Sequence, residues 1–222
     1  MDGLLRDLGS RLQRGSRALA LERAPRLATG LPDIDALVGG GFPTGRLSEI
    51  AGPASSGRTS VGQALLARAT RSGETVALVD VAAAFDPPSA HAAGVVLERV
   101  LWVRPPALRQ AVRCCECLQD AHGFALVLLD LARGDRSELP ASTWQRLARS
   151  ASGTGTALVV LSEARTTGTH AELVLEMEPG RAHFSGTRPL LEGLSIEARV
   201  ARHRSGPAQR VASVRLSTTR AA

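Results

Sequence analysis

Short runs of consecutive apolar residues alternate along most of the chain with longer stretches whose apolar positions recur every three or four residues. Continuous apolar runs are typical of strands buried on both faces, and the spaced pattern is typical of helices that pack on one side. This order predicts an α/β fold with a mostly parallel sheet flanked by helices. The predicted strands are residues 47–51, 75–81, 124–131, 157–162 and 171–177, and the predicted helices are 31–37, 60–72, 106–122 and 140–151.

The first stretch of the chain has an amphipathic pattern. Over residues 2–21, leucines recur at helical spacing with arginines between them, which predicts a helix with one apolar stripe. Such a helix either packs on its own domain or docks on another protein, and the pattern leaves both readings open. We therefore divide the chain into an N-terminal helix and linker (1–26) and a single core (27–222). The stripe consists of Leu4, Leu5, Leu8 and Leu12.

The end of the chain has the two-residue alternation of strands. Residues 195–204 and 210–217 flank a Ser-Gly-Pro turn, which predicts a β-hairpin that closes the edge of the sheet. The chain contains no lysine, so its net charge of +6 comes from arginine. A basic hairpin face would contact the phosphate backbone of DNA, although solvated arginines on an edge strand are the commoner outcome. The arginines concerned are Arg199, Arg202, Arg204, Arg210 and Arg215.

Composition excludes several classes of protein. Aromatic residues make up only 3% of the chain, so it offers no stacking platform for single-stranded nucleic acid. Cys114, Cys115 and Cys117 are too close together for a disulfide framework, and with dispersed histidines they predict no metal site. No apolar run reaches the ~18 residues of a membrane span, and the first residues lack a secretory signal pattern. We expect a cytoplasmic protein with no membrane partner.

A glycine- and serine-rich segment carries the clearest chemistry. Residues 52–59 (GPASSGRT) lie between a predicted strand and helix and match the phosphate-binding P-loop at every position except one. Glycines let the backbone wrap a phosphate group, and the helix N-terminus attracts its charge. The exception is Arg58, a planar guanidinium in place of the compact lysine ammonium. The predicted nucleotide contacts are Gly52, Ser55, Ser56, Gly57, Arg58, Thr59 and Ser60, with the Thr59 hydroxyl as a magnesium ligand.

Together with this loop, further segments make the chain resemble the RecA superfamily from about residue 29 to residue 165. The resemblance implies a RecA-like P-loop core and ATP with magnesium as the cofactor. It also implies that Asp130, at the end of a buried strand, is the aspartate that supports magnesium. The segments are TGLPDIDAL at 29–37, GRLSEI at 45–50, LVD at 78–80 and FDP at 85–87.

The same resemblance reveals departures at the nucleotide site. Ala82 stands where RecA recombinases carry the glutamate that activates water, and Ser89 stands where they carry an aromatic residue that stacks on adenine. Ser162 and Glu163 replace an asparagine–glutamine pair that senses the γ-phosphate. Loss of a catalytic base alone costs roughly 10²–10⁴-fold in rate. With Arg58, these replacements predict that ATP and magnesium bind weakly or not at all and that hydrolysis is inefficient.

Two short segments and the overall pattern suggest a role. Residues 133–137 and 166–170 stand where recombinases have longer DNA-binding loops. Among RecA relatives, the chain is most similar to the ImuA family, the RecA-like accessories of inducible mutagenesis cassettes. That resemblance implies an adaptor in DNA-damage-induced (SOS) mutagenesis and translesion synthesis, with RecA and an ImuB-like polymerase-family protein as partners. Its N-terminal helix would serve in docking or self-association.

The alternative is an active DNA-dependent ATPase or recombinase paralogue in DNA repair. It is favoured by the residues of the phosphate and magnesium site that keep the family pattern. These are Gly52, Gly57, Thr59 and Asp130.

Overall fold

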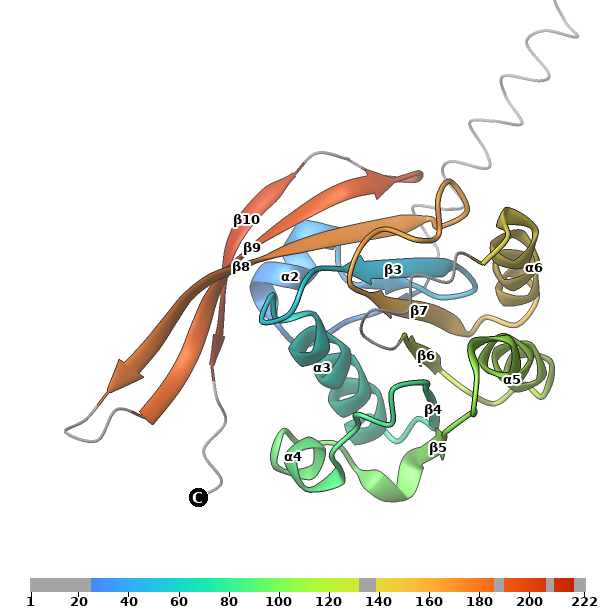
Figure 1. Ribbon diagram of the computed structural model, residues 1–222, viewed down its shortest axis with the longest axis horizontal. Coiled ribbons are helices and arrows are strands. Elements are labelled where there is room, and N and C mark those ends of the chain that lie inside the picture. Colours follow the sequence, from blue (N-terminus) through green and yellow to red (C-terminus); the bar gives the residue numbers. More distant parts are fainter. Residues whose placement is uncertain (1–24, 132–138, 186–189, 207–209, 218–222) are drawn as a thin grey trace, which may run out of the picture.

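The computed structural model describes most of the chain (Figure 1). The predicted helix at 2–21, with its leucine stripe, and the segment at 133–137 lie outside the described residues. Within the described part, no helix is long and apolar enough to cross a membrane. The described residues are 25–131, 139–185, 190–206 and 210–217.

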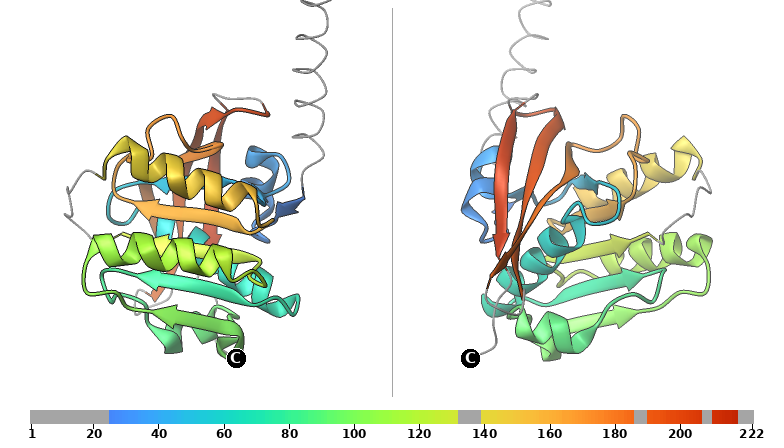
Figure 2. Two further views of the ribbon diagram at one scale, coloured as in Figure 1. Left: turned by 90° about the vertical axis from the view of Figure 1, so that its right-hand side faces the viewer. Right: turned by 60° about the vertical axis from the view of Figure 1, so that its left-hand side comes forward.

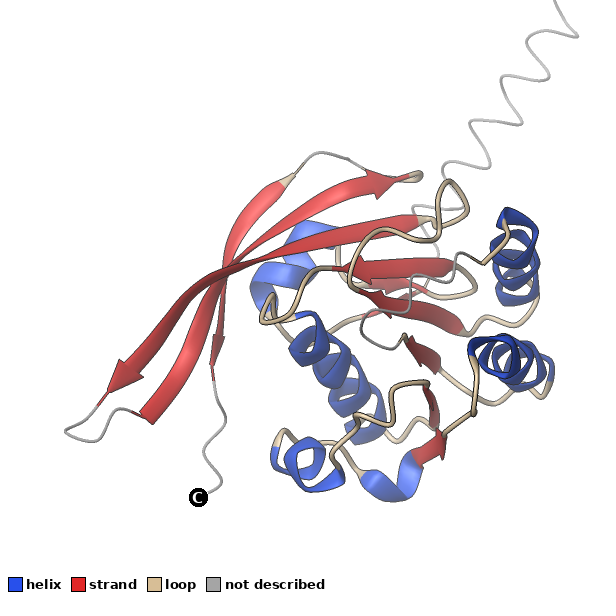
Figure 3. Cartoon of the chain, in the orientation of Figure 1, coloured by secondary structure: helices blue, strands red, loops and turns tan. Residues whose placement is uncertain are grey.

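An eight-stranded sheet forms the centre of the protein (Figure 3). Its strand order is β10-β9-β8-β3-β7-β6-β4-β5, and the strands from β8 to β5 run parallel to one another. β9 is antiparallel to both β8 and β10. This arrangement confirms the predicted α/β fold. The strands are β3 (Leu47–Ala51), β4 (Val76–Asp80), β5 (Val100–Val103), β6 (Leu126–Asp130), β7 (Ala157–Ser162), β8 (Leu173–Ser185), β9 (Leu190–His203) and β10 (Val211–Ser217).

Helices cover both faces of the sheet (Figures 2 and 3). On one face, α2 and α3 bury Ile34 and Leu65 in a core that they share with the sheet, and on the other α5 and α6 bury Cys115 and Leu147. A two-stranded sheet of β1 (Arg26–Leu27) and β2 (Phe42–Pro43) precedes β3. The helices are α2 (Pro32–Val38), α3 (Arg58–Arg71), α4 (Pro87–Ala92), α5 (Leu108–Asp120) and α6 (Ala141–Ser152), with a short 3₁₀ helix, η1 (Leu97–Arg99).

The predicted elements agree best with the structure where both faces of a strand are buried. The predicted strands at 47–51 and 157–162 coincide with β3 and β7, in which every residue is buried. The edge strand β5 was not predicted, although Val100–Val103 is a run of four apolar residues, because so short a run does not distinguish a strand from a helix segment. The sequence pattern also does not predict α4, a six-residue helix that follows Asp86 and begins with prolines.

The hairpin region is longer than the pattern predicts. The antiparallel pair β9–β10 confirms the predicted hairpin, but β9 begins at Leu190 and β8 continues from Met177 to Ser185. In Figure 1 this extension projects from the core as a twisted ribbon. Residues 178–182 are exposed, so they lack the continuous apolar run that identifies a buried strand. The predicted strand at 171–177 is therefore too short.

Candidate nucleotide site

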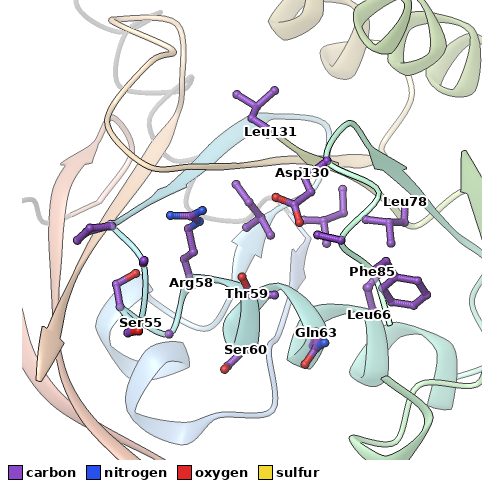
Figure 4. Close-up of a pocket in the computed structure, with 18 of the residues that line it drawn as sticks. Ser55, Arg58, Thr59, Ser60, Gln63, Leu66, Leu78, Phe85, Asp130 and Leu131 are labelled. Atoms are coloured by element: carbon purple, nitrogen blue, oxygen red, sulfur yellow. The ribbon is translucent and has the colours of Figure 1, made fainter. Parts of the chain in front are cut away.

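The P-loop segment lies between β3 and α3, at the carboxyl end of the parallel strands. A cavity of about 310 Å³ lies against it (Figure 4). All the predicted nucleotide contacts except Gly52 line this cavity, and Asp130 does so from the end of β6. The structure therefore brings together the residues that the sequence motif assigns to one site.

The backbone of the loop fits a phosphate group. Gly57 has a φ of +83°, and a Cβ added there would lie 2.5 Å from Leu216 Cδ1. A Cβ on Gly52 would lie 2.5 Å from the carbonyl oxygen of Met177, so both positions require glycine. The first turn of α3 contains no acidic residue, and its N–H groups have no intrahelical acceptor. An anion at this helix end would meet N–H donors and the positive end of the helix dipole.

Arg58 is turned onto its own loop. Its side chain is buried, and Nη1 donates a hydrogen bond to the carbonyl oxygen of Gly52. Nη2 lies 3.9 Å from Glu163 Oε1. The guanidinium thus already has a neutral acceptor and a carboxylate as partners, so that a nucleotide phosphate would have to compete with both.

Glu163 gives the nucleotide site a negative charge of its own. Its carboxylate follows the end of β7, where the sequence predicts an unfavourable approach to phosphate. The structure adds that Arg58 lies beside it, so the two replaced positions partly neutralise each other. The charge of Arg58 is therefore partly neutralised without a bound phosphate.

Thr59 and Asp130 line the same cavity and are the residues that would hold magnesium. Burial, and then the Asp80 carboxylate, raise the pKa of Asp130 to about 6, while Arg58 opposes the shift. Because this pKa lies above the ordinary value of 3.8, ionisation of Asp130 lowers the stability of the metal-free fold as pH rises towards 6. Among the described residues, no group of three or more acidic, His or Cys side chains could hold a metal ion. Magnesium here would need phosphate oxygens as further ligands.

The two departures next to β4 differ in position. Ala82 lines the cavity, where its methyl group can neither accept a proton nor orient water. Ser89 lies in the first turn of α4, and its N–H donates to Asp86 Oδ2 over 2.9 Å. The aromatic side chain that does line the cavity is Phe85.

A hydrogen-bond network fixes the segment that carries Ala82 and Phe85. Asp80 Oδ1 and Oδ2 accept hydrogen bonds from the N–H groups of Ala84 and Phe85, at 3.1 and 3.0 Å. Trp102 Nε1 donates to Asp80 Oδ2 over 3.2 Å, and its ring meets Phe85 edge-on with centroids 5.3 Å apart. No pattern in the sequence pairs Trp102 with Asp80, because the two residues lie on different strands.

A second network was not predicted at all. Glu49, in the middle of β3, is fully buried. Its Oε1 accepts hydrogen bonds from Ser162 Oγ at 2.9 Å and from the Thr166 N–H at 2.7 Å, and its Oε2 accepts from the N–H and hydroxyl of Thr167. These bonds attach the segment after β7, which begins with Glu163, to the strand that leads into the P-loop. The signal in the sequence is a charged residue in the middle of a predicted buried strand.

The predicted hairpin arginines do not form one group. Arg199 makes an ion pair with Glu176, whereas Arg204 donates to the carbonyl oxygen of Thr169. Arg202 is half-buried, and burial followed by the charges of Arg204 and Arg165 lowers its pKa. Arg210 and Arg215 are exposed. Contact of these residues with DNA stays a prediction.

Glu163→Gln is expected to raise the affinity for magnesium–ATP about ten-fold, because it removes a negative charge beside the phosphates and the ion pair with Arg58. The measurement is calorimetric titration with a non-hydrolysable ATP analogue. Glu178→Gln is the matched control, since it removes the same charge from an exposed position that forms no ion pair with Arg58. Equal affinity of the Glu163 variant and the unchanged chain would contradict the competition between Glu163 and phosphate.

Comparison with known proteins places this geometry in context. The chain matches the RecA N-terminal domain over residues 10–139. It is 37% identical over 105 residues to Protein RecA of Clostridium novyi, a stretch that covers 47% of this chain and 30% of that protein. It is also 37% identical over 121 residues to Protein RecA of Roseiflexus castenholzii, covering 54% of this chain and 33% of the relative. The matched part thus spans about a third of the length of these curated relatives.

The fold also has a solved counterpart. The crystal structure of the RadB recombinase matches with a TM-score of 0.68 and 23% sequence identity, and the match covers 85% of this chain and 95% of that one. At this identity the likeness concerns the fold alone.

Proposed function

Because the chain belongs to the RecA family, we propose that it is an adaptor of DNA-damage-induced mutagenesis that keeps the family's fold without efficient ATP hydrolysis. In this role it binds a RecA recombinase and an ImuB-like polymerase-family protein, and so brings translesion synthesis to damaged DNA. ATP and magnesium bind weakly or not at all.

One observation carries this proposal most directly. Arg58 is bound to the Gly52 carbonyl oxygen and lies beside Glu163, while Ala82 occupies the wall of the cavity where a base would be needed. A hydrolytic site needs a free cation for the developing phosphate charge and a group that orients the attacking water. Among the described residues, the engaged Arg58 and the methyl group of Ala82 favour a chain that acts through its surface. A role based on binding uses that surface without turnover.

The proposal predicts that partners bind through the N-terminal leucines and without nucleotide. Leu5→Asp with Leu8→Asp should weaken binding to RecA filaments and to an ImuB-like protein at least about ten-fold, since a helix that docks in a groove depends on its apolar anchors. The measurement is direct binding of purified proteins, in the presence and absence of ATP. The matched control is Arg11→Ala with Arg14→Ala, which changes the same segment but keeps the leucines.

Circular dichroism separates the two readings of the leucine stripe. Loss of binding by a folded double variant supports docking on a partner. Unfolding of the variant assigns the leucines to the chain's own core instead. Binding that requires ATP would contradict an adaptor that works without turnover.

A second candidate function is that of an active DNA-dependent ATPase or recombinase paralogue. The observation in its favour is the preserved phosphate cradle, with Gly52 and Gly57 in conformations and contacts that exclude a side chain, and Thr59 and Asp130 lining one cavity. On this alternative, Arg58 leaves Gly52 and Glu163 when a phosphate enters. Turnover that rises with single-stranded DNA distinguishes this candidate from the adaptor.

A further inference from the structure

A second cavity lies at the opposite end of the sheet from the P-loop. Its volume is about 800 Å³, and it is formed between α6, the start of β3, the segment before β8 and the end of β9. Its basic wall consists of Arg46, Arg149, Arg204 and His170. Gln145 and Ser152 add neutral polar groups from α6. We call this cavity the basic groove.

The positive charge of the basic groove is poorly neutralised. Within the described residues, none of its three arginines forms an ion pair. Arg46 donates to the carbonyl oxygen of Gly45 over 2.7 Å, and Arg204 donates to that of Thr169, so these contacts orient the side chains without cancelling their charge. Arg149 is exposed on α6. The groove is therefore suited to a ligand with negative charges.

The face of the ribbon formed by β8, β9 and β10 is different. The strand register places Glu176 opposite Arg199 and Glu178 opposite Glu197, so acidic and basic side chains share the face. Arg199 and Arg165 both make ion pairs with Glu176. This face pairs acidic with basic side chains, whereas the basic groove has one acidic side chain beside three arginines.

That acidic side chain, Glu172, indicates what kind of ligand fits. It is only 7% exposed, lines the groove, and its Oε1 has no hydrogen-bond partner among the described residues. A buried carboxylate oxygen without a donor is costly. The phosphodiester backbone of DNA has no N–H or O–H group to donate, whereas a peptide backbone has one N–H per residue. A peptide with acidic side chains supplies carboxylates to the arginines and a donor to Glu172.

We propose that the basic groove binds an acidic, extended peptide segment of a partner protein, with Arg149 and Arg204 holding its carboxylates and Glu172 accepting a backbone N–H. The inference rests on the proposed adaptor function, for which it names the chemistry of one partner contact. It involves no nucleotide, because the P-loop lies at the other end of the sheet.

The test uses a fluorescein-labelled Glu-Ala repeat peptide as the probe and anisotropy as the readout. Arg149→Gln with Arg204→Gln should weaken binding about ten-fold, through the loss of two exposed ion pairs. The matched control is Arg181→Gln with Arg215→Gln, which removes the same charge from exposed positions outside the groove. A Gln-Ala peptide should not bind. Equal weakening by both pairs of substitutions would overturn the proposal, because it would show attraction by net charge alone.

Substitutions of Glu172 distinguish a specific hydrogen bond from attraction by charge. If the groove acts only through its charge, Glu172→Ala should strengthen binding of the acidic peptide, because it removes a negative charge. The proposal predicts several-fold weaker binding, because the acceptor for the peptide N–H is lost, and predicts that Glu172→Gln, which keeps a side-chain oxygen, retains most of the affinity. Tighter binding by the alanine variant overturns the proposal.

A single-stranded oligonucleotide serves as the competing probe. If it binds the unchanged chain more tightly than the acidic peptide and depends on the same two arginines, the groove is a nucleic-acid site and the proposal is wrong. All arms are run without ATP, so ATP turnover by the chain, which would defeat the proposed adaptor function, leaves their result unaffected. An absent peptide interaction would conversely defeat the groove assignment alone.

Discussion

Glu49→Ala is expected to lower the free energy of unfolding by about 3–5 kcal/mol, because it leaves buried donors without their acceptor and opens a cavity. Glu49 is fully buried, and four hydrogen bonds from Ser162, Thr166 and Thr167 end on its carboxylate. Alanine would leave two backbone N–H groups and two hydroxyls without this acceptor, in addition to a cavity. Few single substitutions have a comparable effect.

Urea denaturation followed by tryptophan fluorescence measures this loss, since Trp144 is buried and Trp102 is half-buried in the fold. Glu49→Gln keeps one acceptor oxygen and should cost less than the alanine variant. Glu178→Gln changes an exposed carboxylate and should stay within about 0.5 kcal/mol of the unchanged chain. A loss below about 1 kcal/mol in the alanine variant would contradict the role given to Glu49.

The second large effect concerns the rate of ATP hydrolysis. We expect turnover at least about 10²-fold below that of a RecA recombinase, because a missing general base alone costs roughly 10²–10⁴-fold. Ala82 supplies no base, and Arg58 is held by Gly52 and lies beside Glu163. Ala82→Glu alone should leave the rate low, since it restores the carboxylate but leaves Arg58 engaged.

Two hydrogen-bond networks, around Asp80 and around Glu49, fix the segments that carry the replaced residues Ala82 and Glu163. Asp80 fixes the segment that carries Ala82, and Glu49 fixes the segment that begins with Glu163. Both segments are held by hydrogen bonds from their own backbone, independently of any ligand. The altered side chains are therefore kept in place around Arg58. We expect both segments to keep this arrangement when no ATP is bound.

The buried strands were the most predictable part of the fold. Every residue of β3 and β7 is buried, and their predicted bounds coincide with those of the structure, although β3 also contains Ser48 and Glu49. The extension of β8 was not predictable in this way, because an exposed ribbon lacks the hydrophobic contrast between its two faces. The edge strand β5 is a different case, since its four residues are all apolar but too few to identify a strand by periodicity. The hydrophobic pattern of a sequence reflects which residues are buried, so it identifies the buried part of a strand better than an exposed extension.

The residues of the candidate site could be predicted from the P-loop motif, but the contacts between their side chains could not. Glycine and threonine positions of a P-loop are fixed by local spacing, so Gly57 and Thr59 could be assigned from sequence. The partners of Arg58 could not, because Glu163 is distant in sequence and only the order of the strands brings them together. Glu49 could have been singled out as a charge inside an apolar strand. Its four donors could not have been named without the fold.

The most direct test of the central claim is magnesium–ATP turnover by the purified full chain, with and without single-stranded DNA, beside a RecA control. The account predicts phosphate release near background under both conditions, since Arg58 is engaged and Ala82 provides no base. Robust turnover that rises with DNA would contradict it. The chain would then be a working DNA-dependent ATPase in which Arg58 leaves Glu163 and another group replaces the missing base.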